Sequence, residues 1–258
     1  MQTISSIKNS KTPLVMITAY DALFASLFDT KVDIILVGDS LNMSFNAKAD
    51  TLSADMEIML YHTKAVCAGA KKTLIVCDMP FGTYTDENIA LKNASRVYRE
   101  TNAHAVKIEG GEKRAHIIKT LTSNSIAVMG HIGLMPQFVR SEGGYKVRGK
   151  TKEDIEQLIL DAKAVEKAGA FCMVIEGVKA DAVACISNSV DIPTIGIGSG
   201  VDTDGQVLVW SDAFGFVKDF KPKFVKNYLN GTKLIEDAIE NYANEVRNRE
   251  FPSEKYTY

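Results

Sequence analysis

AVKIEGG, residues 105–111, reads as a short buried strand that carries two charged side chains. Lys107 and Glu109 lie two residues apart, so an extended strand points both side chains to the same face. Buried strands rarely place charged residues on an inner face unless each one has a partner. The stretch therefore predicts a strand that ends in a polar cluster, to which other strands contribute the partners.

Seven further β-rich runs occur along the chain. Most intervals between the runs carry apolar residues at spacings of three and four, which is typical of helices that bury one face. Eight strands that alternate with helices predict an α/β fold, a (β/α)₈ barrel, in preference to an open doubly wound sheet. The predicted strands cover residues 14–20, 33–39, 73–80, 105–111, 126–133, 171–177, 193–200 and 207–215.

The clearest helical patterns fall in residues 53–70, 86–103 and 151–170. Thr151 is expected to cap the third of these helices, because a threonine followed by an acid three residues later satisfies backbone N–H groups at a helix start. After about residue 224 the chain reads as a helix with a polar end. We therefore expect a single barrel domain over residues 1–258, with a C-terminal helical tail from about 224.

Composition excludes several classes of function. The 258 residues are 46% hydrophobic, and the net charge is −2 with acids and bases interspersed, so no basic stripe indicates a nucleic-acid partner. No apolar run approaches the about 20 residues of a membrane helix, and the polar start does not resemble a secretory signal. The four cysteines are scattered without a CxxC pair. These features predict a reduced, cytoplasmic protein.

Acidic residues recur where the predicted strands end, which in a barrel is the face that carries the chemistry. The phase of strand two supports an inward direction, because Asp39 shares a face with the apolar residues Ile35 and Val37. If the other strands behave alike, the side chains converge over a packed interior. The polar residues in this position are Asp39, Ser40, Asp78, Lys107, Glu109, His131 and Glu176.

Four buried carboxylates repel one another, and one lysine cannot neutralise them. A hard divalent cation such as Mg²⁺ can, since it prefers oxygen ligands. Asp39, Asp78 and Glu109 come from three consecutive strands, so we expect them to form the metal cluster. Other readings stay open: each acid can be a turn residue, Lys107 can be an ion-pair partner or a Schiff-base amine, and His131 can be a hydrogen-bonded core histidine.

Several motifs in order resemble the ketopantoate hydroxymethyltransferase family from about residue 3 to beyond 245. They include VGDSLNM, VKIEGG, GHIGLMPQ, GGYKVRG and IGIGSG. The resemblance implies a barrel of the phosphoenolpyruvate/pyruvate type. It also implies a Mg²⁺-dependent, aldol-type transfer of a hydroxymethyl group from 5,10-methylenetetrahydrofolate to 3-methyl-2-oxobutanoate. The reaction passes through a magnesium-stabilised enolate and gives 2-dehydropantoate, an intermediate of pantothenate biosynthesis.

Carried over by position, the resemblance implies roles for individual residues. The family's metal ligands fall on Asp39, Asp78 and Glu109. Its ketoacid-binding residues fall on Asp39, Ser40, Asp78 and Lys107, and its proposed base falls on Glu176. His131 is a possible additional site residue. The resemblance also implies a homodecamer.

Three positions depart from the residues usual in the family, namely Asn42 for glycine, Met135 for threonine and Ser199 for alanine. None removes a carboxylate, so the implied reaction stands; Met135 is placed to alter contacts with the folate. Residues 143–150, rich in glycine and cations, are either a mobile lid or a solvated turn. Three alternatives remain open: a Mg²⁺-dependent lyase or mutase of the phosphoenolpyruvate mutase/isocitrate lyase group, a Schiff-base aldolase using Lys107, and an inactive barrel that serves as a binding module.

Overall fold

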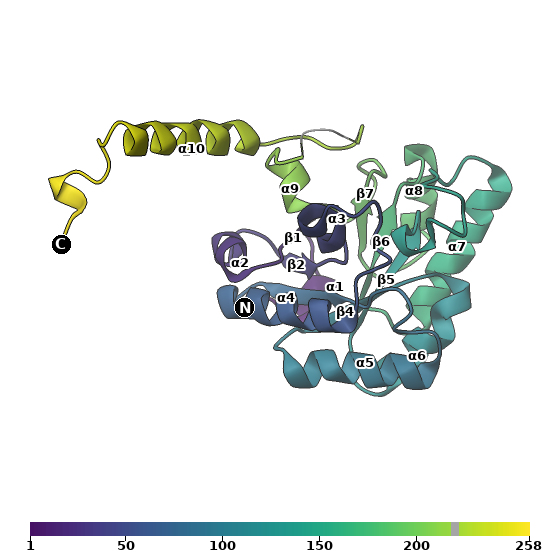
Figure 1. Ribbon diagram of the computed structural model, residues 1–258. Coiled ribbons are helices and arrows are strands. Elements are labelled where there is room, and N and C mark those ends of the chain that lie inside the picture. The colour runs from purple at the N-terminus through teal and green to yellow at the C-terminus, as the bar shows by residue number, and fades with distance from the viewer. Residues whose placement is uncertain (218–221) are drawn as a thin grey trace. The chain divides into compact units, whose positions relative to one another are not determined.

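The structure, a computed structural model, describes residues 1–217 and 222–258, and these form two compact units (Figure 1). The first unit, Met1–Val209, contains all the named strands. The second, Trp210–Tyr258, contains α9 (Trp210–Ala213), α10 (Gly231–Arg247) and the short 3₁₀ helix η3 (Glu254–Tyr256). The predicted C-terminal helix is therefore present in the second unit; its union with the barrel in a single domain stays a prediction.

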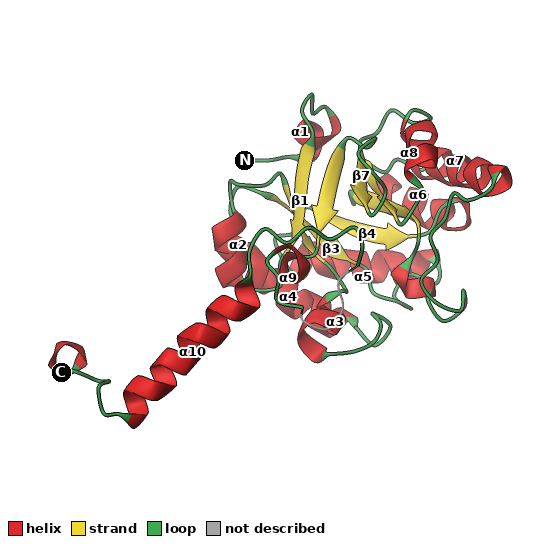
Figure 2. Ribbon diagram, turned by 90° about the horizontal axis from the view of Figure 1, so that it is seen from above, coloured by secondary structure: helices red, strands yellow, loops and turns green. Residues whose placement is uncertain are grey.

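Eight parallel strands close into a barrel, with β8 paired to β1. Figure 2 shows the strands in yellow and the red helices of the first unit around them. Closure confirms the predicted (β/α)₈ barrel, and the open-sheet alternative is wrong. The strands are β1 (Leu14–Thr18), β2 (Ile34–Val37), β3 (Leu74–Asp78), β4 (Ala105–Glu109), β5 (Val128–Gly133), β6 (Cys172–Glu176), β7 (Thr194–Ile197) and β8 (Gly205–Leu208).

Five helices of the first unit begin at a residue whose side chain caps them, namely Thr3, Asp21, Asp55, Asp86 and Thr151. Thr151 accepts a hydrogen bond from the N–H of Asp154 at 3.2 Å, which confirms the predicted cap. None of the helices in the described ranges is long and apolar enough to cross a membrane. The helices are α1 (Ile4–Lys8), α2 (Ala22–Phe28), α3 (Leu41–Asn46), α4 (Met56–Gly69), α5 (Glu87–Glu100), α6 (Ala115–Ser123), α7 (Lys152–Lys167) and α8 (Ala180–Ser187), with 3₁₀ turns η1 (Glu112–Arg114) and η2 (Pro136–Phe138).

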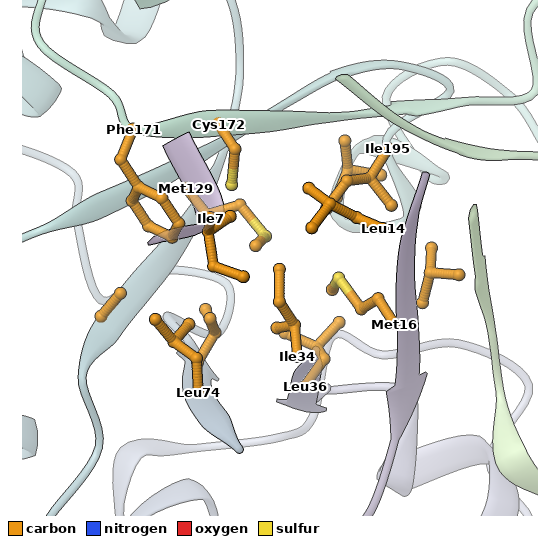
Figure 3. Close-up of a cluster of buried hydrophobic side chains, with 14 residues drawn as sticks. Ile7, Leu14, Met16, Ile34, Leu36, Leu74, Met129, Phe171, Cys172 and Ile195 are labelled. Atoms are coloured by element: carbon orange, nitrogen blue, oxygen red, sulfur yellow. The ribbon is translucent and has the colours of Figure 1, made fainter. Parts of the chain in front are cut away.

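The barrel interior is filled by apolar side chains from the strands, and Ile7 of α1 packs among them (Figure 3). Ile34 and Leu36 belong to this cluster, so alternation turns Ile35 and Val37 to the helix side of β2. The predicted inward phase of strand two is therefore wrong. Asp39 reaches the site for another reason: it lies beyond the end of β2, where the chain has left the strand and turns toward α3.

The eighth predicted strand is displaced. Residues 207–215 were expected to be extended, whereas β8 covers Gly205–Leu208 and α9 begins at Trp210. The apolar run VLVW continues across the junction, and a short apolar run has no periodicity that separates strand from helix. The end of β8 therefore adds no charged side chain to the polar face of the barrel.

Candidate active site

The predicted site residues converge at the C-terminal ends of β2 to β6. Strand register puts Asp78 beside Lys107 and Glu109 beside His131. Glu176 ends β6, and Asp39 and Ser40 follow β2 directly. Parallel strands in a closed barrel end on one face, so residues that are far apart in the sequence become neighbours there.

Lys107 occupies the centre of the cluster, and three other side chains lie around its ammonium group. Its Nζ lies 2.8 Å from Oδ1 of Asp78 and 4.0 Å from Oε1 of Glu109. It also lies 3.1 Å from Nδ1 of His131. Burial opposes the charge of Lys107, which is only 4% exposed, but the carboxylates led by Asp78 raise its pKa above the usual value. The side chain is therefore a stable ammonium group.

His131 has one tautomer that fits its neighbours. The ammonium group of Lys107 can only donate, so Nδ1 of His131 accepts and the ring proton lies on Nε2. Nε2 donates to the carbonyl oxygen of Leu134 at 3.1 Å and lies 3.4 Å from Oε2 of Glu176. Burial, together with the charge of Lys107, lowers the pKa of His131. A neutral histidine thus connects Lys107 to Glu176.

Asp39 and Glu109 are buried with more negative charge around them than Lys107 can balance. Burial and the nearby Asp78 raise the pKa of Asp39 to about 7. Burial also raises the pKa of Glu109 well above its usual value; Lys107 opposes this shift, and Asp39 adds to it. The backbone N–H of Asp39 donates to Oδ2 of Asp78 at 3.0 Å, which holds β2 and β3 together at the site.

Glu176 differs from the other acids, since 22% of its side chain is exposed. The expectation of four buried carboxylates is therefore wrong for this residue. The partly open position of Glu176 leaves one carboxylate at the cluster in contact with solvent.

Ser40 lies beside Asp39 in the sequence, but the contact of its hydroxyl group is with Tyr20, at 2.9 Å between the two oxygens.

The donor set of Asp39, Asp78 and Glu109 fits a hard divalent cation. All three side chains offer oxygen ligands, and in their ionised forms they carry more negative charge than one lysine neutralises. Oδ1 of Asp78 is buried and has no aligned hydrogen bond, although Lys107 is within ion-pair distance. Within residues 1–217 and 222–258, no three histidine, cysteine or acidic side chains are arranged to hold a metal ion as they stand.

Gln137 is the contact residue that sequence reasoning missed. It lies in η2, after β5, and is buried. Its side-chain amide donates to Oδ2 of Asp39 at 2.8 Å, and its backbone N–H donates to Oε2 of Glu109 at 3.0 Å. Loop residues carry no periodic signal, so only its place at the end of the motif GHIGLMPQ could have indicated this role.

Two of the three residues that depart from those usual in the family, Asn42 and Ser199, make side-chain hydrogen bonds in the structure. The buried amide of Asn42 donates to Oγ of Ser53 at 2.8 Å and to the carbonyl oxygen of Asp50 at 3.2 Å, so it fixes the turn after α3. Ser199 donates to the carbonyl oxygen of Ile175 at 2.8 Å and accepts from the N–H of Val178 at 3.2 Å. These contacts bracket Glu176. Met135 stays without an assigned contact to the folate.

The segment 143–150 is anchored at its end. Arg148 donates to Asp154 through Nε at 2.9 Å, and its backbone N–H donates to the carbonyl oxygen of Gly177 at 2.8 Å. Tyr145 is exposed, and its hydroxyl group contacts the sulfur of Met43 at 3.9 Å. Both interpretations of the segment, a mobile lid and a solvated turn, stay open.

Comparison with known proteins gives a consistent family assignment. The family described as ketopantoate hydroxymethyltransferase matches residues 1–254. A protein of Aliarcobacter butzleri named 3-methyl-2-oxobutanoate hydroxymethyltransferase is 65% identical over 257 residues, covering 99% of this chain and 96% of its own length. The protein of the same name from Sulfurimonas denitrificans is 63% identical over 258 residues, with coverage of 99% and 98%.

Solved structures share the fold at much lower identity. A phosphonopyruvate hydrolase in complex with oxalate and Mg²⁺ superposes with a TM-score of 0.65 at 12% identity, covering 99% of this chain and 93% of the other. A 2,3-dimethylmalate lyase, described as a PEP mutase/isocitrate lyase superfamily member, gives 0.61 at 13% identity, covering 98% and 90%. At this low identity, the likeness shows a shared fold alone.

Proposed function

Because the chain belongs to the ketopantoate hydroxymethyltransferase family, we propose that it transfers a hydroxymethyl group from 5,10-methylenetetrahydrofolate to 3-methyl-2-oxobutanoate, which yields 2-dehydropantoate. The observation that carries this proposal is the 65% identity to a relative named for the reaction, over 99% of the chain. The cluster of Asp39, Asp78, Lys107, Glu109 and Glu176 at one end of the barrel supports it. Pantothenate biosynthesis is the corresponding pathway.

We assign Asp39, Asp78 and Glu109 as the residues that hold Mg²⁺. The excess of buried carboxylates over Lys107 and the oxygen-only donor set support this assignment. When bound, the cation supplies Lewis-acid polarisation of the keto group and so acidifies the neighbouring C–H. The raised pKa of Asp39 and Glu109 means that protons compete with the cation for this site.

We propose that Lys107, in its charged ammonium form, binds the ketoacid together with Asp39, Ser40 and Asp78. Its ammonium group offsets the charge of the substrate carboxylate and of the enolate as it develops. A Schiff-base aldolase needs a neutral amine at this position. The raised pKa of Lys107 opposes that reading, since the contact with Asp78 stabilises the charged form. Electrostatic stabilisation is the role that fits the geometry.

Glu176 is proposed as the base that removes the proton from C3 of the ketoacid. It is the acid of the cluster that lies open to solvent, while Asp39, Asp78 and Glu109 are tied to internal donors. Neutral His131, 3.4 Å away through Nε2, orients the carboxylate without neutralising it. The C–H electron pair then forms the C–C bond to the methylene carbon of the folate. One C–N bond of that carbon breaks, and its nitrogen takes up a proton equivalent to the one removed from C3. Water replaces the second nitrogen: the remaining C–N bond breaks, the hydroxyl group of water binds the carbon, and the other proton of water goes to the nitrogen, so that tetrahydrofolate leaves.

The lyase or mutase alternative is supported only by a likeness of fold at about one residue in eight identical. The inactive-barrel alternative has to explain why several buried carboxylates, which are costly to desolvate, gather at this end of the barrel. A homodecameric assembly and a cytoplasmic location remain predictions from the resemblance and the composition.

A direct test uses ¹³C-labelled 5,10-methylenetetrahydrofolate and unlabelled 3-methyl-2-oxobutanoate, followed by NMR. The proposal predicts a labelled hydroxymethyl carbon in 2-dehydropantoate, and no product when the folate is left out. Consumption of the ketoacid at an equal rate without folate would instead indicate the lyase or mutase chemistry.

A further inference from the structure

Gln137 makes four hydrogen bonds to residues in and around the site. It is 4% exposed, and it connects residues that follow or belong to three separate strands. Its backbone N–H donates to Glu109, while Nε2 donates both to Asp39 at 2.8 Å and to the carbonyl oxygen of Met79 at 3.0 Å. Its Oε1 accepts from the hydroxyl group of Tyr84.

These partners fix the orientation of the amide group. Nε2 faces two acceptors, a carboxylate and a carbonyl, and Oε1 faces a hydroxyl donor. Rotating the amide by half a turn would place its oxygen against Asp39 and against the carbonyl of Met79, and would leave Tyr84 facing an NH₂ group. Gln137 is therefore a fixed double donor, and the loop after β5 is held to the site through it.

We propose that Gln137 is a positioning residue for the divalent cation: it holds one oxygen of Asp39 and one of Glu109 and so sets the spacing of two carboxylates from different strands. The second oxygen of each side chain would then serve the cation; in Glu109 this is Oε1, which lies 4.0 Å from Nζ of Lys107. This inference rests on the proposed function, since it needs the cation site. Groups that orient metal ligands commonly matter for affinity almost as much as the ligands do.

The test is a titration of the apo protein with Mn²⁺ alone, followed by the EPR signal of the free ion. Gln137→Met keeps the length of the side chain and removes the amide that donates to Asp39, while the backbone N–H that donates to Glu109 stays. We expect the Kd of Mn²⁺ to rise by about 10- to 100-fold, the usual range for loss of a group that orients a metal ligand. The matched control is Gln157→Met, an exposed glutamine on α7 that contacts Asp161 at 3.3 Å, and its Kd is expected to stay that of the wild type.

Tyr84→Phe provides a second, milder variant in case Gln137→Met does not fold. It removes the donor that orients Oε1 and leaves the amide in place, so we expect the Kd to rise by about 2- to 10-fold, the size of one neutral hydrogen bond. A merely structural role would lower the melting temperature of Gln137→Met with no change in Kd, and that result overturns the inference. An unchanged Kd in Tyr84→Phe, where only that variant folds, overturns it too. If the wild type itself shows no saturable binding, the metal site of the proposed function fails, and the inference fails with it.

Discussion

Replacing Lys107 by methionine tests whether the buried charges depend on one another. The ammonium group is 2.8 Å from Asp78, 4.0 Å from Glu109 and 3.1 Å from the ring of His131. Removing one partner of a buried ion pair leaves the other charge uncompensated, which costs about 3–5 kcal/mol. Methionine keeps the apolar length of the side chain, so the loss is chiefly electrostatic. We expect the free energy of unfolding to fall by that amount without divalent cation, and Mg²⁺ to restore part of it.

The assay is guanidinium denaturation of wild type and Lys107→Met at one fixed protein concentration, in EDTA and in Mg²⁺. The matched control is Lys152→Met on α7, where the lysine side chain is 85% exposed and lies 3.9 Å from Glu156. Exposed pairs contribute little, so that variant should stay within about 0.5 kcal/mol of the wild type. A loss below about 1 kcal/mol for Lys107→Met in EDTA would refute the reasoning that a buried charge is left unpaired.

Three further variants test separate parts of the account. Glu176→Gln should slow proton exchange at C3 by about 10²- to 10⁴-fold with Mn²⁺ binding unchanged, because only the base is lost; exchange at the wild-type rate would remove Glu176 from that role. Ser199→Ala should fold and reduce kcat by less than about 10-fold, since it loses the hydrogen bonds beside Glu176; a larger loss would contradict an indirect role. Partial burial opposes the charge of Asp29, but hydrogen bonds from residues 71–73 outweigh it and lower its pKa to about 2. A carboxylate whose pKa is lower in the folded state stabilises the protein at pH values above its unfolded-state pKa, and this contribution is lost as pH falls toward 2. Asp29→Asn should therefore lower the free energy of unfolding by about 1 kcal/mol at pH 7, after allowance for solvent screening, and by less at pH 3. An equal deficit at both pH values in urea denaturation would contradict this sign.

The sequence predicted the barrel and most of the site because strands that are consecutive in the chain are neighbours in a parallel barrel, so the residues at their ends lie close together. Lys107 and Glu109 share a face of β4 with Ala105, which is in the interior cluster, as alternation requires. Once the strands were counted, the position of Asp78 followed from its place at the end of β3. These inferences used only local pattern and the rule that strand ends meet on one face.

The sequence pattern could not predict the positions of residues that lie beyond the end of a strand. Asp39 was expected to be in phase with Ile35 and Val37, but the interior of β2 is lined by Ile34 and Leu36, and the acid arrives through the turn after the strand. Gln137 reaches Asp39 across 98 positions of sequence from a loop with no repeat to mark it. Tertiary contacts of loop residues are set by the fold around them, so they cannot be read from spacing.

We expect a metal-dependent enolate to form in this site without the folate. The most direct measurement is deuterium exchange at C3 of 3-methyl-2-oxobutanoate, followed by NMR, with Mg²⁺ and with excess EDTA. We predict exchange with Mg²⁺ and its loss in EDTA, since Asp39, Asp78 and Glu109 supply the cation site and Glu176 the base. Exchange that proceeds equally well in EDTA would contradict the account and return attention to Lys107.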